Sequence, residues 1–444
     1  MYLRKLAITN FRSLKNFSWS LAAGEEAGWH VFLGPNGCGK SSVLKAVALA
    51  IGGNSAFFGL RLPVDQFLRR GAASTTINLE LSWSSRWDMW KGAATGLKKP
   101  LIALKVMLSS KNASAGFTSD GKAPDLSLWS GKRGWFSAAF GPLRRFTGDG
   151  REALQLAKAP PRLARHLSIF GEEFALGESL AWLRELHHKS LEESHVQKRA
   201  DQVPENGDLR FDAGFVGDDN VRLLASIKKL LNESGLLPHG VKFDSISSNT
   251  VYFVDGNGAK LSILDLSDGY RAVLALVLEL LRLMVECYAG KSLINDAGTQ
   301  VDAPGVVLID EVDAHLHPEW QRTIGQSLCR MFPKVQFLVT THSTHVAQGA
   351  LNGSVWVMPE PGTDGVVKRL KDESLARVIY GDVLHALGGE AFGGVPGRSD
   401  HANEELDRLA ALGQRESLQR LSVPQKKELR GLRAKMSAVM VPGR

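Results

Sequence analysis

Apolar and polar positions in the first third of the chain predict mainly β-structure around one helix. Residues 3–11 and 29–33 are predicted strands, and residues 41–51 are a predicted helix. Apolar and polar positions then alternate from residue 75 to about residue 117, with connections rich in Gly, Ser and Lys between residues 109 and 122. Because such alternation is typical of half-buried strands, an antiparallel β-subdomain is predicted there.

The middle of the chain changes from strand to helix and back. A strand is predicted at residues 135–140, and a mostly helical stretch at residues 160–235 is interrupted by a polar loop at residues 201–208. A hairpin is predicted over residues 251–264, with Asp255-Gly-Asn-Gly258 as its turn.

Two short apolar runs, residues 306–309 and 335–340, follow a polar loop at residues 295–304. Both are rich in β-branched residues, which is typical of buried parallel strands. After about Pro361 the chain becomes charged and helical, with a Gly-rich interruption at residues 388–397. These patterns predict an α/β fold, and because no heptads are sustained, no long coiled coil is expected.

The composition is that of a globular chain. Hydrophobic residues make up 44% and charged residues 23%, which excludes a disordered or collagen-like protein. At about 150 residues per domain, the 444 residues suggest two or three units, or one large domain with insertions. The net charge of +8 is compatible with a nucleic-acid-binding face and equally with an ordinary basic surface.

The cysteines and the most apolar stretch indicate the cellular compartment in which the protein works. The three cysteines lie far apart and form no CxxC pair, so neither a disulfide framework nor a cysteine zinc site is expected. The most apolar stretch, residues 272–285, is interrupted by Glu279 and Arg282, and this predicts a buried helix rather than a membrane span. We therefore expect a cytoplasmic protein without a membrane partner.

The strongest chemical signal follows the strand at residues 29–33. The segment from Gly34 to Ser41 matches the phosphate-binding pattern GxxxxGK[ST], and it lies between a strand and a helix as that pattern requires. Loop N–H groups and the helix N-terminus favour phosphate oxygens, Lys40 reaches the β- and γ-phosphates, and the Ser41 hydroxyl binds Mg²⁺. The candidate nucleotide-binding residues are Gly34, Pro35, Asn36, Gly37, Cys38, Gly39, Lys40, Ser41 and Ser42.

A second signal is the apolar strand that ends in Asp310 and Glu311. Asp310 is suited, with Ser41, to hold Mg²⁺, and Glu311 is suited to orient or deprotonate the attacking water. A strand ending in Asp-Glu is common by itself and gains this meaning from the phosphate-binding loop upstream. Together the two motifs predict an ATP hydrolase that uses ATP and Mg²⁺, with Lys40 and Glu311 among its catalytic residues.

Two further motifs resemble parts of the ABC superfamily of ATPases. The segment Leu266-Ser267-Asp268-Gly269 opens an apolar helix, where Ser267 is by itself a natural N-cap, and it resembles the LSGGQ signature. The segment Thr340-Thr-His342-Ser343 ends a strand where that superfamily has its switch histidine. The resemblance implies that Ser267 and Gly269 of one subunit contact the γ-phosphate held by another, and that His342 is catalytic.

The histidines His315 and His317 lie close together and suggest a metal site. We reject that interpretation because the nearby acids are assigned to Mg²⁺ and no third ligand has a suitable spacing. In the resemblance to the ABC superfamily this stretch is the D-loop. The resemblance therefore implies that Asp313 contacts the neighbouring subunit.

Several segments resemble the ABC-type ATPases of prokaryotic anti-phage systems, such as PtuA-like proteins of Septu and retrons and the ATPase of PARIS. Asn10-Phe-Arg-Ser13 resembles the start of SMC-like, RecF-like and OLD-family heads, and the run at residues 308–321 resembles the defence ATPases. The resemblance implies that Arg12 lies near the nucleotide, and an ordinary surface position fits almost as well. The segment from Phe140 to Arg145 resembles the GYGPxRR element of the PtuA-like group.

One departure from the SMC-type pattern concerns Mg²⁺. SMC-type heads carry a glutamine after the strand that precedes the helical lobe, whereas this chain has Gly141-Pro-Leu-Arg144. We therefore expect Arg144 or Arg145 to face phosphate instead. The chain also lacks the CxxC of a zinc hook and the acidic DxD pattern of a TOPRIM nuclease after His342, so no nuclease of its own is expected.

The sequence thus predicts an α/β P-loop NTPase with an ABC-ATPase head, an antiparallel β-subdomain, a helical lobe and a C-terminal helical extension. Two ATP molecules would be sandwiched between head-to-tail subunits of a homodimer or higher homo-oligomer, which ATP closes and hydrolysis opens. The four expected regions are an N-terminal ATPase lobe at 1–150, a helical lobe at 151–245, a C-terminal ATPase lobe at 246–360 and a helical extension at 361–444.

These sequence features are compatible with two functions. The resemblance implies a sensor ATPase that controls a separate nuclease or toxin encoded nearby and responds to a phage protein or to double-stranded DNA. The alternative is a RecF- or SMC-like repair ATPase that clamps duplex DNA on a basic face. Residues after about Ser374 either form a helical cap on the chain's own head or a docking surface for the effector or a neighbouring subunit.

Overall fold

The computed structural model describes residues 1–60, 62–83, 86–88, 101–111, 114–119, 135–144, 164–171, 177–201, 219–289, 292–363, 365–381, 400–418 and 421–440. Its contacts divide the chain into two compact units, Met1–Gly381 and Asp382–Arg444. The finer division into four regions stays a prediction. Arg145, most of the predicted polar loop (202–208) and the Gly-rich interruption at 388–397 lie outside the described residues.

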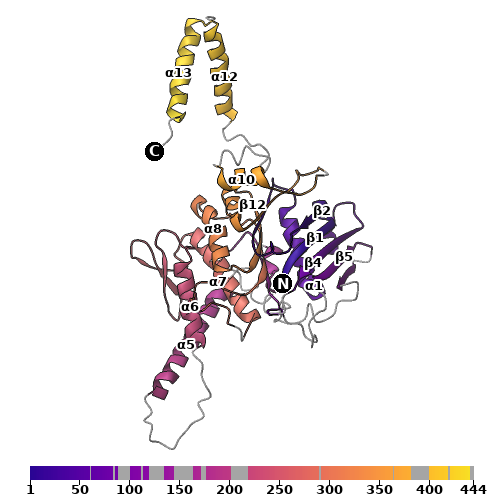
Figure 1. The fold of residues 1–444 in the computed structure, drawn as a ribbon, viewed down its shortest axis with the longest axis vertical. Coiled ribbons are helices and arrows are strands. Elements are labelled where there is room, and N and C mark those ends of the chain that lie inside the picture. The colour runs from indigo at the N-terminus through magenta and orange to yellow at the C-terminus, as the bar shows by residue number, and fades with distance from the viewer. Residues whose placement is uncertain are drawn as a thin grey trace, which may run out of the picture. The chain divides into compact units, whose positions relative to one another are not determined.

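A six-stranded sheet forms the centre of the first unit (Figure 1). Its strands, in spatial order, are β14 (Lys368–Arg369), β13 (Gly353–Val357), β3 (Gly28–Leu33), β12 (Val335–Thr341), β11 (Gly305–Ile309) and β7 (Ser137–Phe140). The strands from β13 to β7 run parallel, and β14 is antiparallel at the edge. Every residue of β3, β7, β11 and β12 is buried, which explains why these segments are mainly apolar without alternation.

An antiparallel sheet accounts for the predicted β-subdomain. Its order is β2 (Leu14–Ser20), β1 (Tyr2–Phe11), β4 (Ser74–Ser82), β5 (Leu101–Ser109) and β6 (Ser114–Ser119). Strand β6 lies where we expected a connection, so that expectation was wrong. It is a strand because it pairs with β5 over its whole length and buries Phe117 in the core.

Helix α1 (Lys40–Leu60) packs between the two sheets, with contacts to β1, β4 and β5 and to β7, β11 and β12. It extends beyond the predicted end at residue 51, and Gly53, at φ 78°, interrupts the helical backbone. Because both of its faces meet a sheet, nearly all residues of its first three turns are buried. The helix therefore fixes the phosphate-binding loop, which ends at its N-terminus, relative to both sheets.

On the other face of the central sheet lie α8 (Pro318–Met331) and α9 (Thr344–Gln348), which contact β3. Trp29 of β3 is fully buried there, and its Nε1 donates to the carbonyl of Val346 at 3.3 Å. A Cβ on Gly325 of α8 would lie 2.9 Å from the indole, so only glycine allows this close packing. Helix α10 (Asp372–Tyr380) contacts α9.

The predicted helical stretch contains α5 (Glu178–Asp201) and α6 (Asp219–Glu233), which pack against each other. Helix α6 contacts a small sheet of β8 (Lys242–Ile246), β9 (Val251–Val254) and β10 (Lys260–Ser262), which contains the expected hairpin. Helix α7 (Asp268–Cys287) is the predicted buried helix, and Arg282 joins its Glu279 to Glu178 of α5 at 2.6 and 3.0 Å. Within the described residues no helix has the length and apolarity to cross a membrane.

The second unit consists, as far as it is described, of α12 (Asp400–Ser417) and α13 (Val423–Met440). The two helices contact each other, and Leu412 and Leu429 are buried between them. Ion pairs join Arg408 to Glu428 at 2.9 Å and Arg433 to Glu416 at 2.5 Å.

Candidate functional site: a phosphate-binding loop facing two acids and a histidine

The phosphate-binding loop lies between β3 and α1, as its sequence predicts, and glycine is required within it. Gly37 and Gly39 adopt φ of 80° and 100°, which side chains rarely allow. A Cβ on Gly39 would lie 2.5 Å from Leu14 Cδ2 and 2.9 Å from Ser13 Oγ. The loop therefore packs directly on the β1–β2 turn, and its backbone comes close to anything bound in front of it.

Lys40 is the first residue of α1 and is almost fully buried. Its Nζ donates to the carbonyls of Gly34 at 2.7 Å and Pro35 at 2.9 Å, so the side chain folds back over the loop. Burial lowers the pKa of Lys40, and the nearby Cys38 and Asp310 oppose that shift. The ammonium is therefore held at the loop, where phosphate oxygens are the natural acceptors.

Three segments far apart in sequence meet at the Asp310 carboxylate. Ser41 Oγ donates to Asp310 Oδ1 at 2.9 Å, and Thr340 Oγ1 donates to the same oxygen at 2.5 Å. The Thr340 hydroxyl also accepts a hydrogen bond from the backbone N–H of Glu311 at 2.8 Å. A hydroxyl and a carboxylate oxygen at such a separation fit Mg²⁺, which prefers a few protein oxygens beside those of phosphate.

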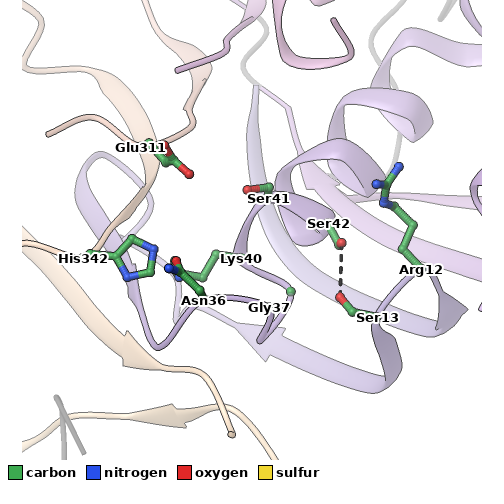
Figure 2. A pocket seen from close by; sticks show the side chains of 10 residues that line it. Arg12, Ser13, Asn36, Gly37, Lys40, Ser41, Ser42, Glu311 and His342 are labelled. Atoms are coloured by element: carbon green, nitrogen blue, oxygen red, sulfur yellow. Dashed lines mark hydrogen bonds between the residues drawn. The ribbon is translucent and has the colours of Figure 1, made fainter. Parts of the chain in front are cut away.

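These contacts lie at a pocket of about 290 Å³ (Figure 2). Figure 2 shows Lys40 and Ser41 of the loop facing Glu311 and His342, which come from the ends of β11 and β12. The residues that line the pocket are Arg12, Ser13, Asn36, Gly37, Gly39, Lys40, Ser41, Ser42, Glu311 and His342. Most of the lining residues were thus named as candidate site residues from the sequence. Ser13 was not among them, and its Oγ lies 3.4 Å from Ser42 Oγ.

His342 follows β12 directly, and its exposed side chain lines the pocket. Partial burial and the positive charge of Lys40 lower its pKa, and the carboxylates of Asp313, Glu311 and Asp310 oppose the shift. Because the ordinary pKa of histidine is about 6.5, the imidazole is neutral at pH 7. A neutral ring has one donor and one acceptor nitrogen, so it can both hydrogen-bond a phosphate oxygen and accept a proton.

Arg12 occupies the turn between β1 and β2. Its backbone has φ 51°, and its N–H donates to the carbonyl of Phe67 at 3.0 Å, which fixes the turn. The side chain is exposed and lines the pocket, and its place near a nucleotide stays a prediction.

Arg144 differs from the expectation that it faces phosphate. The residue is 5% exposed, and its guanidinium donates to backbone carbonyls, among them those of Asp310 and Val312 at 3.1 Å. It does not line the pocket. The expected phosphate contact is corrected for a physical reason, since these N–H donors are already used inside the protein.

The signature-like segment lies at a different pocket of the same chain, of about 430 Å³. Ser267 lines that pocket together with Tyr270. It occupies the N-cap position of α7, but its exposed side chain makes no capping hydrogen bond, so helix capping does not explain this serine. Gly269 is close-packed, since a Cβ there would lie 3.1 Å from the Trp320 ring and 3.3 Å from the His315 carbonyl.

Asp313, for which the resemblance implies a D-loop role, is hydrogen-bonded within its own chain to the residue before His342. Thr341 Oγ1 donates to Asp313 Oδ1 at 2.5 Å. Gln321 connects the same segments, since its Nε2 donates to the Leu316 carbonyl at 2.9 Å and its Oε1 accepts from Ser343 Oγ at 2.6 Å. Sequence reasoning missed Thr340, Thr341 and Gln321 as site residues. The sequence signal for them was their place beside His342 and in the run at residues 308–321.

His317 has a structural role. Its ring Nδ1 accepts a hydrogen bond from the backbone N–H of Glu319 at 3.4 Å, which caps the N-terminus of α8, and Pro318 takes the first helical position. The Asp-Ala-His-Leu-His-Pro run is therefore the entry to a helix.

Comparison with known proteins identifies relatives along most of the chain. "Septu protein PtuA" of Bacillus mycoides (strain KBAB4) is 27% identical over 363 residues, which are 81% of this chain and 40% of that protein. "Retron Ec83 probable ATPase" of Escherichia coli is 39% identical over 106 residues, 24% of this chain and 18% of that protein. The resemblance inferred from the motifs is confirmed, although the match spans less than half the length of either relative.

A solved structure confirms the fold class. The SMC head bound to the C-winged helix domain of ScpA superimposes with a TM-score of 0.50 over 83% of this chain and 98% of that chain, at 14% identity. Residues 1–79 match the profile of the family described as "AAA ATPase domain". Residues 103–347, more than half of the chain, match a second profile. On that match the chain belongs to the family described as "AAA domain, putative AbiEii toxin, Type IV TA system".

Proposed function

We propose that this chain is the regulatory ATPase of an anti-phage defence complex, which binds and hydrolyses ATP and thereby controls a separate effector. The observation that carries the proposal is the hydrogen bond between Ser41 and Asp310, with oxygens 2.9 Å apart, beside a pocket that Ser41, Lys40, Glu311 and His342 line. The similarity to PtuA and to a retron ATPase supports the defence role.

Each residue has a defined part in the proposed reaction. The loop N–H groups, the N-terminus of α1 and Lys40 bind the phosphates, and Ser41 and Asp310 would hold Mg²⁺. When bound, Mg²⁺ neutralises charge on the β- and γ-phosphate oxygens. Glu311 accepts a proton from the attacking water, and neutral His342 hydrogen-bonds the γ-phosphate.

The second half of the proposal is a head-to-tail dimer. Ser267 has an exposed hydroxyl without a capping partner, and neither Ser267 nor Gly269 lines the nucleotide pocket of its own chain. In the proposed dimer both face the nucleotide pocket of the partner subunit. Since ATP then contacts two chains, it binds the closed dimer more tightly than the open one and shifts the equilibrium toward closure.

Hydrolysis is tested with two substitutions that act differently. Glu311→Gln keeps the side-chain shape and removes its basicity, so ATP should bind while turnover falls by about 10²-fold or more. Lys40→Ala should weaken ATP binding itself, because it removes the buried ammonium at the loop. Steady-state phosphate release and calorimetric ATP titration separate the two effects. If Glu311→Gln hydrolyses ATP at the wild-type rate, the catalytic assignment fails.

The shared site is tested by mixing two inactive variants. Ser267→Arg would place a bulky cation against the opposing pocket, and Lys40→Ala disables the loop. In a mixed dimer one composite site carries both defects and the other carries neither. Random mixing of independent sites should therefore restore about a quarter of the wild-type rate. Mixed dimers that form, as shown by differently tagged chains, and yet stay inactive would count against sites shared in this way.

The effector is the remaining part of the proposal, and the second unit is its proposed docking surface. In α13 the exposed residues Lys426, Lys427 and Arg430 give a basic surface that suits an acidic partner. A chain truncated before Pro396 should stay folded and bind ATP but lose co-purification with the product of the adjacent gene. A truncated chain that retains this product, or one that is insoluble, favours a helical cap instead. ATPase activity stimulated by duplex DNA alone would favour a repair ATPase.

A further inference from the structure

Arg144 is a buried arginine that donates hydrogen bonds to the backbone of two segments beside the nucleotide pocket. Nη1 donates to the carbonyls of Gly141 and Asp310, both at 3.1 Å. Nη2 donates to three further carbonyls, those of Glu311 at 3.3 Å, Val312 at 3.1 Å and Ala314 at 3.3 Å. The side chain therefore ties the end of β7 to the loop after β11, which carries Glu311 and Asp313.

The guanidinium keeps its charge in this position. Burial lowers the pKa of Arg144 to about 10, and the nearby carboxylates of Asp313, Asp310 and Glu311 oppose the shift. The group is thus cationic at pH 7, and hydrogen bonds from a cation are stronger than those from a neutral donor. A lysine would keep the charge but not the planar fork that reaches several carbonyls at once.

The bound carbonyls include both that flank the Cα of Glu311. The carbonyl of Asp310 belongs to the peptide group before this Cα, and the carbonyl of Glu311 belongs to the one after it. Glu311 has φ 45°, a left-handed conformation that residues other than glycine seldom adopt. On the other side, Thr340 Oγ1 accepts from the Glu311 N–H at 2.8 Å. Because both peptide planes are fixed, the direction of the Glu311 Cα–Cβ bond is fixed as well.

We infer that Arg144 is a positioning residue that acts through Glu311: it holds the backbone in the left-handed conformation that directs this carboxylate into the nucleotide pocket. The inference deepens the proposed function and rests on it. Arg144 has no contact with phosphate in this account, so it affects the rate of hydrolysis and not the affinity for ATP.

The test compares Arg144→Lys and Arg144→Gln with the wild-type chain. Both variants should bind ATP, by calorimetry with Mg²⁺, within about threefold of the wild type, because the loop and Lys40 are unchanged. Their kcat should fall by about 10- to 100-fold, the effect expected when a reacting group is misplaced by about 1 Å. Circular dichroism and the fraction of ATP-competent chains show whether each variant is folded.

A double-variant cycle separates positioning from a general structural role. In the Glu311→Gln background the Arg144→Lys change should lower the single-turnover rate by less than about twofold, because the group that Arg144 positions has lost its basicity. Arg165→Lys is the matched control. Arg165 is also buried beside β7, with its guanidinium 5.8 Å from the centre of the Phe136 ring, and its replacement should leave kcat unchanged.

Several results would overturn the inference. Weaker ATP binding with an unchanged kcat would assign Arg144 to phosphate, and multiplicative losses in the double variant would make it independent of Glu311. Failure of both Arg144 variants to fold would assign the residue to stability alone. A wild-type chain that does not hydrolyse ATP refutes the proposed function and this inference together, whereas an active wild type with an equally active Arg144→Lys variant refutes only the inference.

Discussion

Replacing Thr340 by valine tests whether one buried hydroxyl holds the carboxylate of the proposed magnesium site. Thr340 is fully buried near the end of β12 and is hydrogen-bonded to Asp310 Oδ1 at 2.5 Å and to the Glu311 N–H at 2.8 Å. Valine has nearly the same shape, so the change opens no cavity. It removes the donor that orients Asp310 and leaves the Glu311 N–H without this acceptor.

The expected magnitude follows from these two bonds. A hydrogen bond to a carboxylate contributes about 1.5–3 kcal/mol, and a buried N–H without a partner costs about 1–3 kcal/mol, so we expect a loss of about 2.5–6 kcal/mol in stability. Ser41 also donates to Asp310 Oδ1 at 2.9 Å, but it is itself a proposed magnesium ligand, so Thr340 is the hydroxyl partner of this carboxylate that would not bind the metal. Loss of such an outer partner typically lowers metal affinity or activity by about 10- to 100-fold.

The assay is a Mg²⁺ titration of ATP hydrolysis at saturating ATP, with urea denaturation alongside. The Mg²⁺ concentration for half-maximal activity should rise by about 10- to 100-fold in Thr340→Val. It should stay near the wild-type value in Thr340→Ser, which keeps the hydroxyl. Thr75→Val is the matched control, since Thr75 is 1% exposed and donates to a neutral carbonyl, that of Thr9, at 2.7 Å. An unchanged Mg²⁺ requirement in Thr340→Val, with no more destabilisation than in Thr75→Val, refutes the reasoning.

Two further predictions concern packing and pH. Gly39→Ala should weaken ATP binding by at least about tenfold, measured by calorimetry, because its Cβ would lie 2.5 Å from Leu14 Cδ2 at φ 100°. Gly413→Ala, where a Cβ meets nothing within 4 Å, should leave ATP binding unchanged. Burial lowers the pKa of His30 to about 4. Between pH 6.5 and 4 the unfolded chain therefore binds a proton there that the folded chain does not, and stability should fall by about 3 kcal/mol as the pH drops through that window. His30→Gln should lose less stability than the wild type between pH 7.5 and 5 in urea denaturation, and an equal loss would assign the acid sensitivity to other groups.

The sequence alone located the parts whose chemistry requires adjacent residues of fixed type. The phosphate-binding loop needs glycine where φ is 80° and 100°, and a lysine and a serine where α1 begins, so its pattern is visible without a structure. The strands β3, β11 and β12 were predictable for a related reason. They are buried on both faces, and mainly apolar residues without alternation suit that environment.

Strands whose partners decide their conformation were not predicted. Four of them are β2, β8, β13 and β14, and β6 was expected to be a connection. Strand β14 has two residues, Lys368 and Arg369, and becomes a strand only because it pairs with Val357 and Trp356 of β13. A segment of that length has no periodicity to detect, so its structure depends on what lies beside it.

The roles of single side chains at the site were decided by tertiary structure. Thr340 is one polar residue in an apolar strand, and its function exists only because β11 pairs with β12 and brings Asp310 within 2.5 Å of its hydroxyl. Arg144 shows the same limit more sharply. From the sequence, Arg144 is a cation near a nucleotide site, and it could bind either a phosphate or a set of carbonyls. In the structure Arg144 is 5% exposed and donates to carbonyls of residues 310–314, so its partners are carbonyls. A residue type determines which partners are chemically acceptable, and the fold determines which of those partners lies within hydrogen-bond distance.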